Sequence, residues 1–282
     1  MEKILIADAG STKTSWSLSG QPEKQFCRIT GAGVNPAHDS EDYLLENFSL
    51  VKEGLPPAKI DKIYFFGSGC ATSSLKKKIR DSLANVFKTE EIIVESDLLG
   101  AAIALFGMDT GVAAILGTGS ASCVCSEGKI INQVPSLGYL LGDEGGGVSL
   151  GKRLLNGIFK RTFSESLIEN FQEEYNLSLP ELINRVYGDK KAATFIGSFT
   201  PFLKKQIQNK EIKALIENEF ISFFEKNIIP YGNSGNYNIG FVGSIAFNFK
   251  DVLIECAKKF NYKVTSIIQH PLPYLENFYI QK

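Results

Sequence analysis

Residues 111–120 read Gly-Val-Ala-Ala-Ile-Leu-Gly-Thr-Gly-Ser, and this stretch decides the fold. Its apolar part, residues 112–116, ends abruptly in a loop of glycine and hydroxyl residues. The apolar run predicts a buried strand. Because glycine has no side chain, the loop can bring backbone N–H groups close to an anion. The stretch therefore indicates a phosphate-binding loop, with an ordinary glycine-rich turn as the alternative.

A similar pattern stands near the N-terminus. The apolar residues 4–7 predict a strand, residues 8–14 a tight turn, and residues 15–18 a returning strand. Gly10-Ser11 in this hairpin matches Gly119-Ser120 in the later one. This weak internal repeat predicts a duplicated fold with two similar halves, whose two glycine loops face each other across a cleft.

The order of the predicted elements favours the α/β class. In the first half, strands are predicted at 4–7, 15–18, 25–29, 62–67 and 92–94, and helices at 42–51, 73–86 and 98–106. Three consecutive strands followed by alternating helices and strands are typical of a mixed sheet with parallel crossovers. The second half starts with strands at 112–116, 120–125 and 129–132, continues with a mostly helical stretch at 144–226, and ends with strands at 239–242 and 263–267.

The repeat sets the predicted domain boundary. We expect one domain at 1–109 and a second at 110–269, the second with a helical insertion. A terminal helix over 272–280, in the segment 270–282, is expected to pack back on the first domain.

Composition excludes several partners. The formal net charge of -1 gives no electrostatic footprint for nucleic acid or for an anionic membrane surface. Lys76-Lys77-Lys78 is the only basic run, and its helical context predicts a solvated face. No apolar run is long enough to span a bilayer, and no signal peptide is expected ahead of the first strand. Hydrophobic residues make up 44% of the chain, enough for a sizeable core.

The cysteines and histidines limit which kinds of metal site and catalytic site the chain can have. The five cysteines lack CxxC spacing, which favours buried thiols in a reduced, cytoplasmic protein. The two histidines, His38 and His270, argue against a histidine zinc site and against a Ser-His-Asp hydrolase.

The first hairpin carries groups suited to phosphate. Gly10, Ser11 and Thr12 can present N–H groups and hydroxyls to phosphate oxygens, and Lys13 can neutralise charge on them. Asp8 stands where a carboxylate can hold Mg²⁺ through water. The alternative is a plain hairpin tip with a surface lysine. Neither GxxxxGK[ST] nor GxGxxG occurs at this hairpin, so it is not a P-loop or a Rossmann fingerprint.

Taken together, four motifs resemble those of the actin-like ATPase superfamily. They are residues 8–14, residues 117–120, Gly138 with residues 141–145, and residues 242–244. The closest resemblance is to the N-acetylglucosamine kinase family and the wider BadF/BadG/BcrA/BcrD-type ATPases. It implies a duplicated ribonuclease-H-like fold and a homodimer. It also implies ATP with Mg²⁺ in a central cleft and phosphorylation of a hydroxyl of an amino sugar. N-acetylglucosamine is the first candidate for that sugar.

The resemblance also implies residue roles. Asp97 matches the catalytic base and also a sugar ligand; the alternative is that Ser96 or Asp97 only caps the following helix. Asn35 matches a sugar-binding asparagine; the alternative is a turn residue fixed by Pro36. Asp143 matches a further sugar ligand, or else caps a helix that begins near Glu144. Thr118 and Gly138 complete the implied sugar site. The implied nucleotide ligands are Asp8, Gly10, Ser11, Thr12, Lys13, Thr14, Gly117, Thr118, Gly119, Gly243 and Ser244, with Asp8 as the metal ligand.

Two positions depart from the family pattern. Ala121 stands where an asparagine usually follows the Gly-Thr-Gly-Ser loop, and Leu137 stands where a tryptophan is expected. Both positions face the sugar in the family. Glucosamine, N-acetylmuramic acid and other hexose derivatives therefore stay open as acceptors.

Two other functions stay open. Related ATPases activate 2-hydroxyacyl-CoA dehydratases and hold an iron–sulfur cluster between two subunits. Cys123 and Cys125 lie two residues apart on a predicted strand, so their side chains share one face of it. Two subunits would then supply the four cysteine ligands of one cluster. Buried core thiols are the alternative. A nucleotide-dependent sensor without sugar transfer is the non-enzyme hypothesis.

Overall fold

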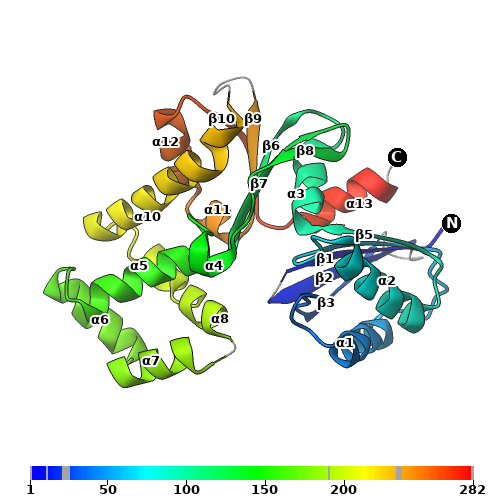
Figure 1. The fold of residues 1–282 in the computed structure, drawn as a ribbon, viewed down its shortest axis with the longest axis horizontal. Helices are drawn as coiled ribbons and strands as arrows, with labels where there is room; N and C mark the ends of the chain where they lie inside the picture. The colour runs from blue at the N-terminus through cyan, green and yellow to red at the C-terminus, as the bar shows by residue number, and fades with distance from the viewer. Residues whose placement is uncertain (1, 11, 21–25, 190, 233–236, 281–282) are drawn as a thin grey trace. The chain divides into compact units, whose positions relative to one another are not determined.

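The computed structural model describes residues 2–10, 12–20, 26–189, 191–232 and 237–280. The chain divides into two compact units (Figure 1). Unit 1 comprises Met1–Asp109, Cys125–Ile130 and His270–Lys282, and unit 2 comprises Thr110–Val124 and Ile131–Gln269. The short segment Cys125–Ile130 is grouped with unit 1, which the sequence did not indicate; there the N–H group of Glu127 donates to the carbonyl of Met108 at 2.9 Å.

The sheet of unit 1 is mixed, as predicted. Its strands are β1 (Ile4–Ala9), β2 (Lys13–Ser19), β3 (Phe26–Ala32), β4 (Lys62–Gly67) and β5 (Glu91–Ser96), in the order β3-β2-β1-β4-β5. β1 runs antiparallel to β2 and parallel to β4, and β4 runs parallel to β5. The carboxyl ends of β1, β4 and β5 therefore meet at one edge of the sheet.

Helices cover both faces of this sheet. They are α1 (Glu41–Gly54), α2 (Ser73–Phe87), α3 (Asp97–Phe106) and α13 (Leu272–Ile280). α1 and α2 pack together over a core in which Trp16, Phe48 and Phe65 contact one another. α13 contacts α3, β1 and β2, so the end of the chain returns to unit 1. Its Tyr279 stacks on Tyr64 of β4 with ring centroids 4.0 Å apart.

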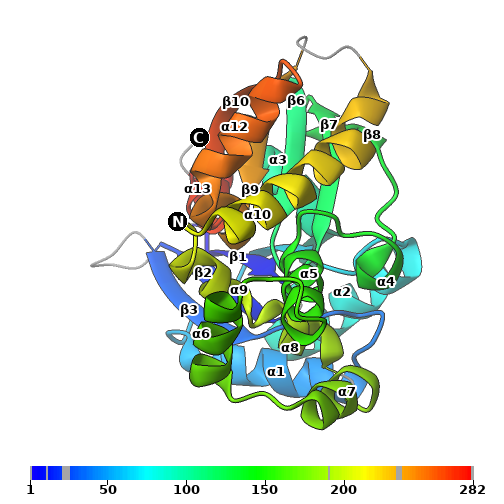
Figure 2. The same ribbon diagram turned by 90° about the vertical axis from the view of Figure 1, so that its left-hand side faces the viewer.

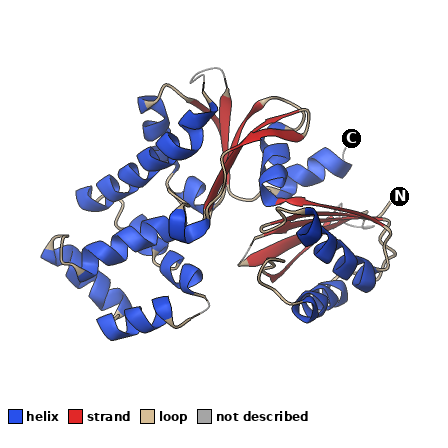
Figure 3. Ribbon diagram, viewed as in Figure 1, coloured by secondary structure: helices blue, strands red, loops and turns tan. Residues whose placement is uncertain are grey.

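Unit 2 repeats the strand order of unit 1. Its strands are β6 (Gly111–Leu116), β7 (Ser120–Ser126), β8 (Lys129–Gln133), β9 (Asn238–Val242) and β10 (Lys263–Ile268), in the order β8-β7-β6-β9-β10. β9 runs parallel to both β6 and β10. β6 corresponds to β1, and each later strand of unit 2 corresponds in turn to β2 through β5. The predicted duplication of an α/β fold is confirmed, and Figure 3 shows the strands of the two sheets in red.

The helical insertion of unit 2 lies between β8 and β9. The helices of unit 2 are α4 (Gly138–Leu141), α5 (Gly147–Phe159), α6 (Glu165–Tyr175), α7 (Leu179–Tyr187), α8 (Ala192–Gly197), α9 (Thr200–Lys205), α10 (Lys210–Phe223), α11 (Ser244–Asn248) and α12 (Lys250–Lys259). α10 continues into a π-helical turn, Phe224–Ile228, and a 3₁₀ turn, Ile229–Tyr231. α10 packs beside α12, as Figure 2 shows. Within the described ranges, no helix has the length and apolar character needed to cross a bilayer.

Candidate active site

The first hairpin is tighter than the sequence indicated. β1 continues through Asp8 to Ala9, and β2 already begins at Lys13, so residues 8–14 are not all turn. The N–H group of Gly10 donates to the carbonyl of Lys13 at 3.0 Å. Because side chains alternate along β2, Lys13 is exposed whereas Thr14 is buried, and the Oγ1 of Thr14 has no hydrogen-bond partner among the described residues. Thr12 is exposed, and Ser11 lies outside the described residues.

Two carboxylates lie at the carboxyl edge of the sheet of unit 1. Asp8 is the residue before the end of β1, and Asp97 comes directly after β5. Burial raises the pKa of Asp8 to about 7; repulsion from Asp97 raises it further, and the nearby charge of Lys13 lowers it. Burial raises the pKa of Asp97 to about 6, although the N–H group of Leu98 donates to it at 2.9 Å. The fold thus places both Asp97 and Lys13 within electrostatic range of Asp8.

The capping question at Asp97 has a clear answer. Ser96 is the N-cap of α3, and its Oγ accepts a hydrogen bond from the N–H group of Leu99 at 3.2 Å. Asp97 is the first residue inside the helix, and its side chain is half-buried. Since Ser96 supplies the cap, the carboxylate of Asp97 is not needed for that purpose. A carboxylate with a pKa near 6 can accept a proton at neutral pH.

Asn35 lies in a loop that contacts both the first hairpin and the turn after β4. The N–H group of Val34 donates to the carbonyl of Gly10 at 3.2 Å. The Oδ1 of Asn35 accepts from the N–H group of Ala37 at 3.1 Å, and a Cβ atom at Gly69 would lie 2.1 Å from that same Oδ1. Asn35 therefore shapes the turn through its oxygen, while its Nδ2 has no partner among the described residues. The turn role does not exclude a ligand role.

Gly69 and Cys70 connect Asn35 to Asp97. Gly69 has a φ of +78°, in the left-handed region that favours glycine. The thiol of Cys70 is buried, and its pKa is raised to about 12 by burial and by the charge of Asp97. No role was predicted for this loop. Ser68-Gly69, which directly follows the predicted strand 62–67, was the signal that could have shown it.

The first residues of α5 hold the Gly-Thr-Gly-Ser loop of unit 2 through hydrogen bonds. The N–H groups of Gly147 and Val148, the first residues of that helix, donate to the carbonyls of Gly117 at 2.8 Å and Thr118 at 2.9 Å. A Cβ atom at Gly117 would meet no atom within 4 Å. The Oγ of Ser120 is buried and has no hydrogen-bond partner among the described residues. An open side and an unmatched buried hydroxyl suit a polar ligand such as a phosphate.

Asp143 lies directly against this loop. A Cβ atom at Gly119 would be 2.5 Å from its Oδ2, and the N–H group of Ser120 donates to its carboxylate. Burial raises the pKa of Asp143. The capping alternative is wrong: α5 begins at Gly147 rather than near Glu144, and its N-cap, Gly146, makes no side-chain cap bond.

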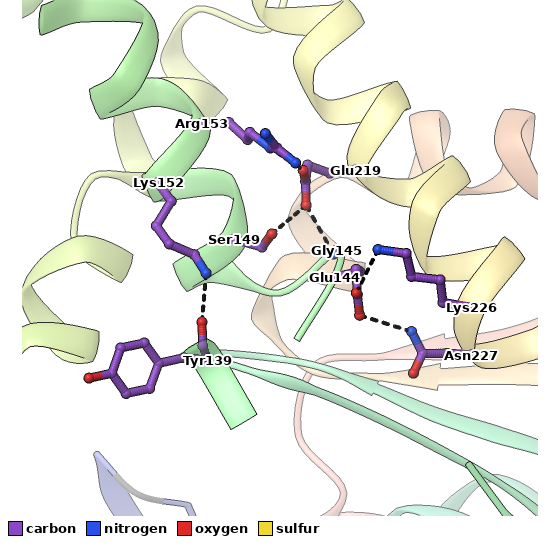
Figure 4. Close-up of polar contacts among 9 residues, drawn as sticks. All are labelled: Tyr139, Glu144, Gly145, Ser149, Lys152, Arg153, Glu219, Lys226 and Asn227. Carbon is purple, nitrogen blue, oxygen red and sulfur yellow. Dashed lines mark hydrogen bonds and ion pairs between the residues drawn. The ribbon is translucent and has the colours of Figure 1, made fainter. Parts of the chain in front are cut away.

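A buried carboxylate of α10 holds α5 and the residue Gly145 just ahead of that helix (Figure 4). The Oε2 of Glu219 accepts from the Oγ of Ser149 at 2.5 Å and from the N–H group of Gly145 at 3.5 Å. Its Oε1 accepts from the Nε of Arg153 at 2.9 Å. Glu144 is held separately, by Lys226 at 2.9 Å and by Asn227, as Figure 4 also shows. Sequence analysis missed Glu219, because it lies 70 residues from Ser149 and carries no local motif.

The last two predicted motifs take different positions in unit 2. Gly243, with a φ of +121°, ends β9 against the second loop, since a Cβ atom there would be 2.3 Å from the carbonyl oxygen of Leu116. Ser244 begins α11. Gly138, with a φ of +69°, begins α4, and a Cβ atom there would meet nothing within 4 Å. The structure thus brings Gly243 to the Gly-Thr-Gly-Ser loop, whereas the space where a Gly138 side chain would lie is empty.

The positions that depart from the family pattern are both accessible. Ala121 is half-buried on β7, and Leu137, just before α4, is 61% exposed. Cys123 and Cys125, by contrast, are buried in β7.

No protein-family model and no curated protein matches the chain. Among solved structures, it is similar to a "Putative N-acetylglucosamine Kinase" from Porphyromonas gingivalis, with 32% identity and a TM-score of 0.88 over 98% of each chain. It is also similar to a protein of the same description from Chromobacterium violaceum, with 15% identity and a TM-score of 0.77 over 99% of each chain. A third similar structure is a ROK family glucokinase from Streptomyces griseus in complex with glucose and AMPPNP. The identity there is 11% and the TM-score 0.55, over 95% of this chain and 93% of that one.

The latter two likenesses support the fold alone, because their identities are low. The first extends over almost the full length of both chains at an identity that shows common membership. The chain belongs to the N-acetylglucosamine kinase family, which has the actin-like ATPase fold.

Proposed function

We propose that the chain is an ATP-dependent kinase that transfers the γ-phosphoryl group of ATP to a hydroxyl of an amino sugar, N-acetylglucosamine being the first candidate. The observation that carries this proposal is the placement of Asp97. Its half-buried carboxylate lies at the carboxyl edge of the sheet, within electrostatic range of Asp8, while Ser96 performs the helix capping.

In the proposed reaction, Asp97 acts on the sugar. One oxygen of its carboxylate accepts the proton of the attacking sugar hydroxyl. At the same time the bond from the sugar oxygen to the γ-phosphorus forms, and the bond from the γ-phosphorus to the leaving oxygen of ADP breaks. The Nδ2 group of Asn35 donates to a sugar oxygen, and Asp143 accepts from a second hydroxyl. Thr118 and Gly138 complete the proposed sugar contacts.

The described residues fit a bound triphosphate. The unmatched Ser120 hydroxyl and the open side of Gly117 leave both a polar partner and room for phosphate oxygens. N–H groups of the loop 117–119 would bind the phosphates. From the first hairpin, Gly10, Thr12 and the unmatched hydroxyl of Thr14 would contribute, and Lys13 would add positive charge. Gly243 and Ser244 would contact the adenosine.

Asp8 is the proposed holder of Mg²⁺. Carboxylate oxygens are the ligands that Mg²⁺ prefers, and it usually keeps several waters. A bound Mg²⁺ would supply charge stabilisation on the phosphate oxygens. A cation beside Asp8 would also offset the repulsion that its carboxylate experiences from Asp97.

The test is ADP release from ATP with purified protein, measured without sugar and with N-acetylglucosamine, glucosamine, N-acetylmuramic acid and glucose. We expect release to depend on a sugar and to be fastest with an amino sugar. Because Ala121 and Leu137 replace the usual polar and aromatic residues, the panel reports whether the N-acetyl group is required. ADP release that no sugar stimulates would contradict the proposal and favour the activator function.

A further inference from the structure

The basic run on α2 makes contacts that a solvated face does not predict. Lys77 is exposed and pairs within the helix with Asp81 at 2.5 Å. Lys78, the next residue, is partly buried and reaches out of the helix to the loop that carries Asn35. The two neighbours are therefore a matched pair: one is a surface ion pair, and the other joins α2 to a predicted sugar-binding loop.

The contacts of Lys78 close this loop. Its Nζ donates to the carbonyl of Pro36 at 3.1 Å and to the carbonyl of Asp39. On the other side of the loop, the Oδ2 of Asp39 accepts from the N–H group of Asn35 at 2.7 Å. The carbonyl of Asn35 accepts from the N–H groups of His38 at 3.0 Å and Asp39 at 2.9 Å.

These bonds determine what the loop offers to a ligand. The carbonyls of Asn35, Pro36 and Asp39 already accept hydrogen bonds, and so does the Oδ1 of Asn35. Among the described residues, the Nδ2 of Asn35 has no acceptor. The loop thus presents a hydrogen-bond donor, which suits an oxygen of a sugar.

Gly69 fixes the same side chain from a third direction. Any side chain at Gly69 would collide with the Asn35 amide, at 2.1 Å from Oδ1. α2 starts shortly after it, with Thr72 as its N-cap. The helix therefore contacts the Asn35 loop through Lys78 and follows directly from the segment on which Asn35 rests.

We propose that Lys78 is a positioning residue for sugar recognition: its ammonium group fixes the loop 35–39, so that the Nδ2 group of Asn35 is oriented to donate to a sugar oxygen. The inference rests on the proposed kinase function. Lys78 itself does not touch the sugar or the reacting atoms, and its effect passes through Asn35.

The experiment compares Lys78→Met, Lys78→Arg and the control Lys77→Met in the full-length protein. We expect Lys78→Met to raise the KM for the sugar about tenfold or more, because bonds from a charged donor hold the loop. Its kcat and its KM for ATP should stay within about twofold of wild type, because Asp97 and the phosphate loops are untouched. Lys78→Arg keeps the cation and should recover most of the sugar KM, and Lys77→Met should behave as wild type.

A second measurement is independent of activity. Amide hydrogen exchange of residues 35–39 should speed up in Lys78→Met and not in Lys77→Met. The inference is overturned if exchange and sugar KM are the same in these two variants, or if the KM for ATP rises as much as that for the sugar. Wild-type protein that releases no ADP with any sugar would contradict the proposed function instead, while the exchange result would still report on the loop.

Discussion

Asp97 is the residue on which the proposed proton transfer depends. Sequence alone placed an acidic residue between a strand and a helix, which is equally typical of a cap and of a base. The structure separates these roles, because Ser96 caps α3 and the neighbouring carboxylate of Asp97 is not used as the cap. A half-buried carboxylate with a raised pKa that does not serve as the cap is more consistent with function than with stability.

The Asp97→Asn variant tests that role. A general base contributes about 10²–10⁴-fold to rate, so we expect kcat to fall by that factor. Binding of a fluorescent ADP analogue should remain within about twofold of wild type, because the phosphate-binding groups are unchanged. Asp81→Asn, which removes a surface carboxylate, serves as the control and should retain full activity. Near-normal turnover in Asp97→Asn would remove Asp97 from the proposed role.

The raised pKa of Asp97 has a measurable effect on stability. A pKa of about 6 in the folded chain, above the ordinary 3.8, means that the folded state holds this proton more tightly than the unfolded state. Its contribution to stability is present below the ordinary pKa and is lost as the pH rises through about 6. Asp97→Asn should therefore match wild type near pH 4 and melt at a higher temperature at pH 8, measured without nucleotide or metal. A constant difference across this range would contradict the assignment.

At the scale of elements, the Gly-Thr-Gly-Ser loop combines two uses of glycine. Gly146 allows a close approach, since a Cβ atom there would be 2.7 Å from the carbonyl carbon of Gly119. Gly117 faces open space instead. The first glycine serves packing between α5 and the loop, and the second leaves room on the ligand side.

Alanine at each position separates the two uses. Gly146→Ala should lower the free energy of unfolding by about 1–3 kcal/mol, because backbone atoms must move apart. Gly117→Ala should leave it within about 0.5 kcal/mol of wild type and weaken ATP binding about tenfold, by filling the space for a phosphate oxygen. Urea unfolding and calorimetric titration with ATP measure the two quantities. Unchanged ATP affinity in Gly117→Ala would count against a phosphate at this side of the loop.

Glu219 provides the second test at this scale. Glu219→Gln weakens bonds to Ser149, Gly145 and Arg153, so we expect the free energy of unfolding to fall by about 1.5–3 kcal/mol. Glu217→Gln on the same helix removes only partly exposed ion pairs with Lys213 and Lys259, and it should change stability by less than about 0.5 kcal/mol. Equal effects of the two variants would show that the buried network is not important for stability.

The sequence predicted those helices and strands whose signals lie within the element itself, and it did not predict contacts between distant parts of the chain. Strand β4 and helix α13 were predicted with their observed bounds, because apolar residues and turn residues mark both ends. The short helices α4 and α11 were missed, since four and five residues are too few to show a helical period. The contacts of Lys78 and Glu219 were missed because their partners lie 39 and 70 residues away in the chain.

At the scale of the whole molecule, duplication explains why two glycine loops exist. Each sheet places its first strand, β1 or β6, at the centre of the order, with a glycine–hydroxyl loop at its end. Unit 1 carries Lys13, Asp8 and Asp97, and unit 2 carries the helical insertion that supports Asp143 and its loop. In the proposed reaction, the first unit carries out the proton transfer and both units contact the phosphates.

Detection of the phosphorylated sugar tests the proposed sugar kinase activity most directly. Purified protein is incubated with ATP, Mg²⁺ and N-acetylglucosamine, and the sugar is analysed by mass spectrometry while ADP is quantified in the same reaction. We predict one sugar phosphate for each ADP with wild-type protein, and a yield lower by about 10²-fold or more with Asp97→Asn. ADP formed without any sugar phosphate, from N-acetylglucosamine or from the other sugars of the panel, would contradict a sugar kinase.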